Sequence, residues 1–388
     1  MKINNWPYFS EEDISSTKEI LNSSKVNYWT GKEGINFESE FKQYIGTDYA
    51  LATSNGTVSL LLAYSAINLK EGDELITTPR GYIAAASIAL ELGAKVVFAE
   101  ISKNSGLITP ETIEPLITRK TKAIAVVHVG GWPARMPEIM ELANKYNLKV
   151  IEDCAQAHGG QINQKKLGSF GDISIWSFCQ DKLISTAGEG GMITTNKKEY
   201  WEYMWSRRDH GKSQKLLMDQ KHKVGFKWLH ANTGLNYRMT EIQSAIGRNQ
   251  LKKLDSWINL RSKNAKAFTQ ALSDIKLVRI PEIEKDAKHA WYKFYIYLRI
   301  EFLDNNWTRE RIIKDIQNQG YPAFTGACPE IYLEKVFNND GSYRNISLPI
   351  AKELGQSSLM FVIHPTITKV QLDAYIDVVK KTLLKASK

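Results

Sequence analysis

Short apolar runs alternate with segments of helical periodicity through the first half of the chain. Strand-like runs cover residues 49–53, 73–78, 95–100, 121–129 and 148–153, and helical patterns cover 58–69, 82–92 and 137–146 between them. Continuous apolar strands separated by helices are typical of a parallel sheet that is covered on both faces. The pattern therefore predicts an α/β fold with a mostly parallel main sheet.

Two further helices are predicted before this alternation. Ser10 and Asp13 have the spacing of a capping box at the start of the first helix. Phe37, Phe41 and Ile45 recur at helical spacing in the second, so one face of that helix is expected to pack against the core.

The C-terminal third of the chain follows a different pattern. Residues 288–300, KHAWYKFYIYLRI, alternate strongly and predict a strand, and helices are expected over 308–317 and 369–384. A chain of 388 residues exceeds what one hydrophobic core usually supports. We therefore predict a large α/β domain over residues 1–250 and a small α+β domain over residues 251–388.

The composition is that of an ordinary globular protein, with 43% hydrophobic and 24% charged residues. The N-terminal MKINNWPYFSEEDI has no apolar core of the kind a signal peptide needs, and no apolar run reaches membrane-spanning length. We expect a cytoplasmic protein without membrane insertion. The three cysteines, Cys154, Cys179 and Cys328, have no CxxC spacing, so neither a disulfide framework nor a zinc site is expected.

The formal net charge of +9 is compatible with nucleic acid, an anionic membrane surface or phosphorylated ligands. The lysines are spread along the chain and no nucleic-acid-binding motif is present, so no nucleic-acid partner is expected. The densest lysine cluster, over residues 212–227, predicts an exposed loop; binding of a nucleotide diphosphate is the second interpretation.

The turn Ser54-Asn55-Gly56-Thr57 leads from a predicted strand into a predicted helix. Such a turn points free backbone N–H groups and the positive end of the helix dipole at one spot, where a phosphate can bind. Ser, Asn and Thr are also the preferred N-caps of any helix. Both interpretations stay open from this stretch alone.

Asp153 follows the predicted strand 148–153 directly, and Gln156 lies three residues later. In open parallel sheets ligands bind beyond the carboxyl ends of the strands, so both residues are candidates for a ligand site. A carboxylate there could bind a ribose, but the chain has neither GxGxxG nor GxxxxGK[ST] to hold the phosphates of a nucleotide.

Lys182 stands between a strand-like run over 172–178 and the glycine-rich GEGG over 188–191, with a return strand at 192–195. A lysine held at the edge of a core can lose part of its hydration, which lowers its pKa and frees the amine to form a Schiff base with an aldehyde. Taken alone, however, a lysine in a loop is more often simply exposed to solvent.

Five motifs in order change that balance: SNGTVSL, TPRGY, IEDCAQAHG, WSFCQDK with GEGG, and GLNYRMTEIQSAIG. Together they resemble the sugar aminotransferases of the DegT/DnrJ/EryC1/StrS group. The likeness covers nearly the whole chain, from WPYFSEEDI onward. It implies the fold-type I, aspartate aminotransferase-like architecture of pyridoxal-phosphate (PLP) enzymes, with a mostly parallel large domain and a smaller α+β domain.

The resemblance also implies how PLP would be held. Lys182 would bind it through a Schiff base and act in catalysis, and Asp153 would pair with the pyridine nitrogen and keep it protonated. Gln156 would hydrogen-bond the phenolic oxygen, and Tyr82 would stack on the ring.

The phosphate of the cofactor would be held by Gly56 and Thr57 at the helix start, with Ser177 five residues before the lysine. Asn236 in the NYRM motif would reach the phosphate of the neighbouring subunit. The resemblance thus implies a homodimer with shared active sites.

The implied reaction transfers an amino group from L-glutamate to a nucleotide-diphosphate keto sugar, in particular a 4-keto-6-deoxy sugar, with pyridoxamine 5'-phosphate as the intermediate form of the cofactor. The product would serve cell-surface polysaccharide such as lipopolysaccharide O-antigen, or a secondary metabolite. Two alternatives are a dehydratase of the same family and a non-catalytic regulatory relative. Dehydratases of the same family replace the lysine with histidine, whereas this chain keeps Lys182. A non-catalytic regulatory relative would be expected to have lost part of the residue set.

Three more residues, Thr30, His158 and Arg238, lie in motifs that border the substrate cleft in relatives. A turn threonine, a structural histidine and a surface arginine are the alternative interpretations. The chain departs from the family pattern at Cys179-Gln180-Asp181, at PAFTGACPEIY over 322–332, and at Arg80. These departures leave the identity of the sugar open.

Overall fold

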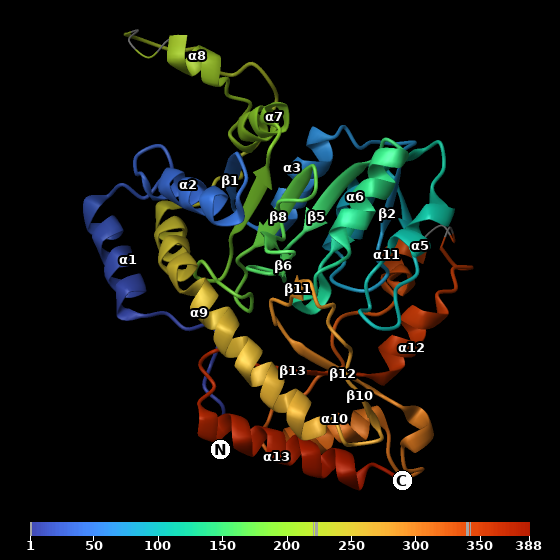
Figure 1. Cartoon of the computed structure of the whole chain (residues 1–388). Coiled ribbons are helices and arrows are strands. Elements are labelled where there is room, and N and C mark those ends of the chain that lie inside the picture. The colour runs from blue at the N-terminus through green and yellow to red at the C-terminus, as the bar shows by residue number, and fades with distance from the viewer. Residues whose placement is uncertain (1, 220, 222–223, 339–340, 342) are drawn as a thin grey trace.

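A seven-stranded sheet forms the centre of the molecule (Figure 1). The computed structural model describes residues 2–388 except 220, 222, 223, 339, 340 and 342. The strand order is β1-β9-β8-β5-β4-β2-β3. The strands are β1 (Tyr49–Thr53), β2 (Glu74–Thr77), β3 (Lys95–Phe98), β4 (Thr121–Val127), β5 (Lys149–Asp153), β8 (Ile173–Ser177) and β9 (Gly191–Thr195).

The sheet is mostly parallel, as the sequence predicts. The neighbours β3, β2, β4, β5 and β8 pair in parallel, and β9 pairs antiparallel with both β8 and β1. Because β9 reverses the direction twice, β1 runs the same way as β5 and β8. The carboxyl ends of these three strands therefore meet at one edge of the sheet, which is the edge where ligands bind in such folds.

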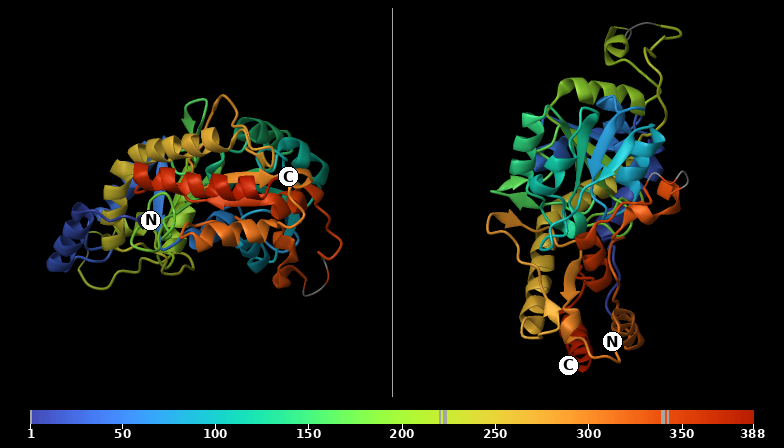
Figure 2. Two further views of the ribbon diagram at one scale, coloured as in Figure 1. Left: turned by 90° about the horizontal axis from the view of Figure 1, so that it is seen from below. Right: turned by 90° about the vertical axis from the view of Figure 1, so that its right-hand side faces the viewer.

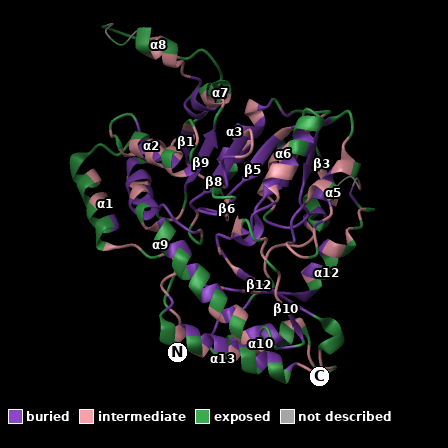
Figure 3. Ribbon diagram, viewed as in Figure 1, coloured by how far each residue is buried: buried purple, intermediate pink, exposed green. Residues whose placement is uncertain are grey.

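Helices cover both faces of the sheet, and its strands are mostly buried (Figure 3). Successive strand residues belong to two different cores. Val150 faces the core built with α2, α6 and α9, while its neighbour Ile151 faces the core built with α3, α4 and α7. Burial on both faces explains the continuous apolar strands. The helices are α2 (Glu33–Ile45), α3 (Gly56–Ala66), α4 (Ala84–Glu91), α6 (Met136–Lys145), α7 (Lys198–Arg208) and α9 (Glu241–Leu272).

A smaller sheet of order β10-β12-β13 lies in the C-terminal part, next to a third core. In this core Phe268 contacts Phe294 with tilted rings and Tyr375 edge to face. Its elements are β10 (Val278–Arg279), β12 (Phe294–Leu298), β13 (Ser358–Phe361), α10 (Arg309–Asn318), α12 (Pro349–Ser357) and α13 (Lys369–Lys385).

A third, small sheet is formed by three two-residue strands. Strand β11 (Ala287–Lys288) pairs with β6 (Gln161–Ile162), which pairs with β7 (Lys165–Lys166). Two short α-helices in the described part of the chain are α5 (Pro110–Ile113) and α11 (Lys335–Asn338).

Helix α9 joins the two parts. It is 32 residues long, and it begins at a capping box in which Thr240 and Gln243 bond each other. The first half packs beside α1 (Glu11–Ser23) and α2, and the later turns reach α13 (Figure 1). The helix therefore crosses the predicted boundary at residue 250, and the division into two domains stays a prediction. Within the described residues, neither α9 nor another helix has an apolar stretch long enough to cross a membrane.

The first residues of the chain contact the C-terminal part. The Asn4 side chain donates to the carbonyl of Thr366 at 2.7 Å, and Ile3 packs against the third core. The predicted capping box of Ser10 and Asp13 starts α1. The lead-in segment thus ties the start of the chain to its end. Of the two helices that follow it, α1 packs beside α9 and α2 packs against both α9 and β1.

The lysine-rich segment projects from the body of the molecule (Figures 1 and 2). The predicted loop over residues 212–227 contains a short helix, α8 (Gln214–Asp219), which the sequence analysis did not anticipate. None of the side chains of α8 is buried. Residues 220, 222 and 223 of the predicted loop lie outside the described residues. Phe226 and Trp228 contact each other edge to face and are both exposed.

Candidate active site

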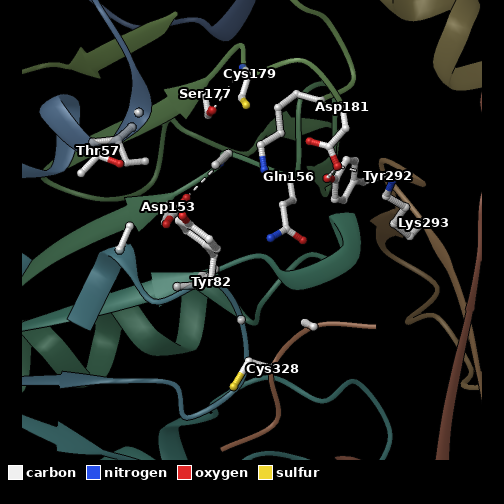
Figure 4. Close-up of a pocket in the computed structure, with 18 of the residues that line it drawn as sticks. Thr57, Tyr82, Asp153, Gln156, Ser177, Cys179, Asp181, Tyr292, Lys293 and Cys328 are labelled. Atoms are coloured by element: carbon white, nitrogen blue, oxygen red, sulfur yellow. Dashed lines mark hydrogen bonds and ion pairs between the residues drawn. The ribbon is translucent and has the colours of Figure 1, made fainter. Parts of the chain in front are cut away.

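A cleft of about 920 Å³ lies at the carboxyl ends of β5 and β8 (Figure 4). One wall is formed by the start of α3 and the ends of these strands. The other is formed by residues of the C-terminal part, among them Tyr292, Lys293, Tyr295, Phe324 and residues 326–328. Seven residues proposed from the sequence line it together: Gly56, Thr57, Tyr82, Asp153, Gln156, Ser177 and Lys182. The fold therefore brings together residues that are spread over more than 120 positions of the chain.

Asp153 is the last residue of β5 and lines the cleft. One carboxyl oxygen accepts the backbone N–H of Ala155 at 3.0 Å. Asp153 is only 8% exposed, and this burial raises the pKa of its carboxyl above the usual value. Such a carboxyl is stabilised when a cationic group binds beside it.

Lys182 lies in the loop between β8 and β9 and is partly buried. Its backbone N–H donates to the carbonyl of Cys179 at 3.0 Å, and its carbonyl accepts the indole N–H of Trp6 at 2.8 Å. The Nζ of Lys182 lies 5.1 Å from the centre of the Tyr292 ring. The backbone of the lysine is thus held from both sides while its amine enters the cleft.

The start of α3 forms a cradle with the end of β8. Asn55 caps the helix by accepting the N–H of Val58 at 2.9 Å, and the N–H groups of Gly56 and Thr57 belong to those that a helix start leaves without an intrahelical partner. A Cβ on Gly56 would lie 2.9 Å from the Cβ of Ser177, so only glycine fits between the two elements. The cradle presents backbone donors and a serine hydroxyl at the positive end of a helix dipole.

The remaining two residues offer an amide and an aromatic ring. The side-chain oxygen of Gln156 accepts the N–H of Gly130 at 2.7 Å, so its amide NH₂ is the group left to donate to a ligand. The side chain of Tyr82 is 72% exposed and borders the cleft next to Asp153 (Figure 4). An exposed ring at this place is available to stack on a planar ligand.

Four residues proposed from the sequence do not line this cleft. His158 is fully buried against Trp176 and Phe178, and burial lowers the pKa of its imidazole to about 3. This placement matches the structural alternative, so the structure gives no support to a contact between His158 and substrate.

Arg238 and Asn236 contact Asp209, which does not line the cleft, and Thr30 follows a residue that also contacts it. Arg238 pairs with the carboxylate of Asp209, and the backbone of Asn236 forms a bridge with that of the same residue. Thr30 follows Trp29, whose indole donates to Asp209 at 2.5 Å. The hydroxyl of Thr30 itself bonds within its own turn. None of the three reaches the cleft of its own chain.

Three polar residues that line the cleft side by side, Asp181, Tyr292 and Lys293, were not proposed as site residues from the sequence. The Tyr292 hydroxyl donates to Asp181, and the Nζ of Lys293 lies 3.6 Å from the same carboxylate (Figure 4). Burial acts to raise the pKa of Asp181, but the hydroxyl and the nearby lysines hold it below the usual value. The only sequence signal was that Asp181 departs from the family pattern.

Arg80, another departure, lies behind the wall of the cleft. It is 3% exposed, and its guanidinium stands 4.8 Å from the centre of the Tyr295 ring and 5.8 Å from that of Tyr297. A Cβ on Gly106 would collide with it at 2.1 Å. Arg80 therefore packs under Tyr295, which itself lines the cleft.

Among the described residues, one group has the spacing of metal ligands: His128, Glu152 and Cys154. Hydrogen bonds already use its nitrogen and oxygen atoms. The Glu152 carboxylate accepts the N–H of Gly168 at 2.6 Å and bonds the His128 ring at 3.1 Å, and the other ring nitrogen accepts the N–H of Ala134. These contacts favour a structural role beside Asp153.

Comparison with known proteins gives the same assignment as the motifs. Residues 7–380 match the DegT/DnrJ/EryC1/StrS aminotransferase family. The chain is 34% identical to GDP-perosamine synthase of Escherichia coli O157:H7, over 92% of this chain and 96% of that protein. The crystal structure of an aminotransferase from Psychrobacter cryohalolentis superposes with a TM-score of 0.97 at 42% identity, covering 99% of both chains. S. venezuelae DesV, solved with a ketimine intermediate, gives a TM-score of 0.86 at 27% identity, covering 96% of this chain and 94% of that one.

The residues of the cleft fit PLP. One cleft contains a lysine amine for its aldehyde, a buried carboxyl for its pyridine nitrogen and an N–H cradle for its phosphate. The fold has the mainly parallel sheet that the resemblance implied. The chain therefore belongs to the DegT/DnrJ/EryC1/StrS aminotransferase family, as a PLP-dependent sugar aminotransferase of fold type I.

Proposed function

We propose that this protein transfers the amino group of L-glutamate to the keto group of a nucleotide-linked sugar. The observation that carries the proposal is the position of Lys182, whose partly buried amine enters the same cleft as Asp153 and the start of α3. The relation to GDP-perosamine synthase supports a nucleotide sugar as the acceptor. We further propose that the acceptor is a 4-keto-6-deoxy sugar. Its amino product would serve the synthesis of cell-surface polysaccharide such as O-antigen, or of a secondary metabolite.

Seven residues would hold the cofactor. Gly56, Thr57 and Ser177 bind its phosphate, and the amide NH₂ of Gln156 donates to its phenolic oxygen. The other three are Tyr82, which covers the ring face, Asp153, which faces the pyridine nitrogen, and Lys182, which binds the aldehyde carbon. When bound, PLP supplies an electron sink that stabilises negative charge on the carbon next to the amine.

Lys182 also moves the proton. With PLP bound, the amine of Lys182 would take a proton from the α-carbon of the donor and would pass it to C4′ of the cofactor. In the second half of the reaction it carries a proton in the reverse direction. Asp153 keeps the pyridine nitrogen protonated, because a buried carboxylate is stabilised by a cation beside it. Lys182 thus transfers the protons, and Asp153 stabilises the charge.

A homodimer with shared sites would give a function to residues outside the cleft. Asn236, Thr30 and Arg238 lie around Asp209 and are exposed or partly exposed, so they can face a second copy of the chain. We propose that Asn236 binds the phosphate held by that copy, with Thr30 and Arg238 near its substrate. Light scattering tests this: a fully active monomer excludes the shared site. A cytoplasmic location stays a prediction of the sequence.

The two alternatives have less support. A sugar dehydratase of the family would carry histidine at position 182, and this chain carries lysine. A non-catalytic relative would have no reason to keep the complete set of residues that lines the cleft.

The test is direct. The purified, PLP-loaded protein is mixed with L-glutamate and a panel of nucleotide-linked keto sugars, and products are identified by mass spectrometry and NMR. Formation of 2-oxoglutarate and an amino sugar is expected, with Lys182→Ala as the inactive control. Absence of any amino sugar across the panel, with glutamate unreacted, would overturn the proposal.

A further inference from the structure

Positive charge is scarce in the cleft. Of the described residues that line it, only Lys182 and Lys293 are cationic, and no arginine is among them. Lys182 is committed to the cofactor and to proton transfer. An anionic substrate group that binds deep in this cleft therefore finds one further cation of the same chain, Lys293.

Lys293 stands at the same end of the cleft as Lys182. Its Nζ lies 4.6 Å from the centre of the Tyr292 ring, and the Nζ of Lys182 lies 5.1 Å from the same centre. The side chain of Lys293 is 15% exposed, and it enters just before β12. Both ammonium groups therefore lie beside the Tyr292 ring, which lines the cleft.

The N–H donors of the Lys293 ammonium have no close acceptor among the described residues. Its polar contact with the described residues is the ion pair with Asp181, and the separation of 3.6 Å is longer than a charge-assisted hydrogen bond. Asp181 is at the same time bonded by the Tyr292 hydroxyl. A mostly buried ammonium whose N–H groups lack close acceptors is stabilised by an incoming anion. Burial also lowers the pKa of Lys293, which a bound carboxylate would oppose.

We propose that Lys293 binds the α-carboxylate of the amino donor, while Asp181 and Tyr292 hold its side chain at the lysine end of the cleft. The inference rests on the proposed function in that the donor is an α-amino acid. An α-carboxylate is bonded directly to the carbon that carries the amine, so it must lie within a few bond lengths of the atoms that react. The diphosphate of a nucleotide sugar is separated from the keto carbon by the sugar ring and would lie farther out.

The test measures binding of 2-methylglutamate, which has no α-proton to lose, through the change in cofactor absorbance. Removing one charged hydrogen-bonded partner corresponds to a loss of about 10- to 100-fold in affinity. We expect this loss in Lys293→Met, a partial recovery in Lys293→Arg, and no change in Lys285→Met, which removes an exposed lysine of the same segment. Retained cofactor absorbance shows that each variant is folded and loaded.

A second arm identifies which carboxylate is bound. In the wild type, the α-amide of L-glutamate should bind about 10- to 100-fold more weakly than L-glutamate itself. In Lys293→Met, the two ligands should bind with equal affinity. The γ-amide should lose the same factor in both proteins. The wild-type comparison holds even if Lys293→Met loads poorly.

The outcomes separate the two proposals. A wild type whose absorbance does not respond to L-glutamate overturns the donor, and the role of Lys293 with it. The other outcome is that the wild type responds to L-glutamate and Lys293→Met binds 2-methylglutamate as tightly as the wild type does. This outcome overturns only the role of Lys293 and assigns the carboxylate to another cation.

Discussion

The indole nitrogen of Trp6 donates a hydrogen bond to the backbone carbonyl of Lys182 at 2.8 Å, across 176 positions of sequence. Trp6 is itself fixed by the edge of Trp257 at 5.1 Å and by the guanidinium of Arg261, 4.8 Å from its ring. The segment before the first helix therefore reaches from the C-terminal part to the loop that carries the lysine. Its contact holds the backbone from which the Lys182 amine extends.

Trp6→Phe should destabilise the protein through this contact. The ring packing is largely kept, but the Lys182 carbonyl loses its donor, which costs about 1–3 kcal/mol when the group stays buried. We expect the free energy of unfolding in urea to fall by that amount. The control is Trp307→Phe, because Trp307 is a partly buried tryptophan beside the third core. It shows how much stability is lost when an indole alone is replaced by a phenyl ring. An unfolding midpoint equal to that of the wild type would show that the bond is not needed.

Asp181→Asn should reduce stability in a pH-dependent way. The pKa of Asp181 is lowered in the folded state, so the stability it contributes is present above the unfolded pKa of about 3.9 and is lost as the pH falls below it. The difference in Tm between wild type and variant should therefore be present at neutral pH and shrink in acid. Asp286→Asn, at an exposed aspartate, is the matched control. A difference that stays constant with pH contradicts the ion-pair account.

Asp153→Asn should separate cofactor binding from catalysis. The amide fills the same space but cannot keep the pyridine nitrogen protonated, and loss of one such electrostatic group typically slows catalysis by about 100- to 1,000-fold. Stopped-flow absorbance of the reaction with glutamate measures this rate. Glu189→Gln, at an exposed acid that lines the same cleft, should react at nearly the wild-type rate. Unchanged turnover in Asp153→Asn would remove the role assigned to it.

Gly56→Ala should weaken the binding of PLP. The new methyl group would lie 2.9 Å from the Cβ of Ser177, so the start of α3 must move away from β8 and the cradle widens. We expect the Kd for PLP, measured by absorbance titration of the cofactor-free protein, to rise by about tenfold, which is the loss of roughly one hydrogen bond. Free inorganic phosphate should compete with PLP less effectively in the variant. Wild-type affinity would mean that the cradle does not hold the phosphate.

The sequence predicts best what depends on local periodicity. The run 49–53 is strand β1 to the residue, and Ser10 caps its helix as expected. Gly56 and Asp153 line one cleft, as expected for residues at a helix start and at the carboxyl end of a strand.

Contacts between distant segments escape such reasoning. Tyr292 and Lys293 fall in a stretch whose alternation indicates only a strand, and nothing local shows that the end of that stretch faces Asp181. His158 shares a motif with Asp153, yet a two-residue turn at the end of β5 sends it into the core. Which side of a loop reaches a ligand is decided by packing rather than by spacing.

The covalent site of the cofactor tests the central claim most directly. The PLP-loaded protein is reduced with borohydride, digested, and the modified peptide is identified by mass spectrometry, alongside Lys182→Ala. We predict that the cofactor is attached to Lys182, that the visible absorbance shifts when L-glutamate is added before reduction, and that the variant carries no label. A label on another lysine, or a protein that takes up no PLP, would contradict the account.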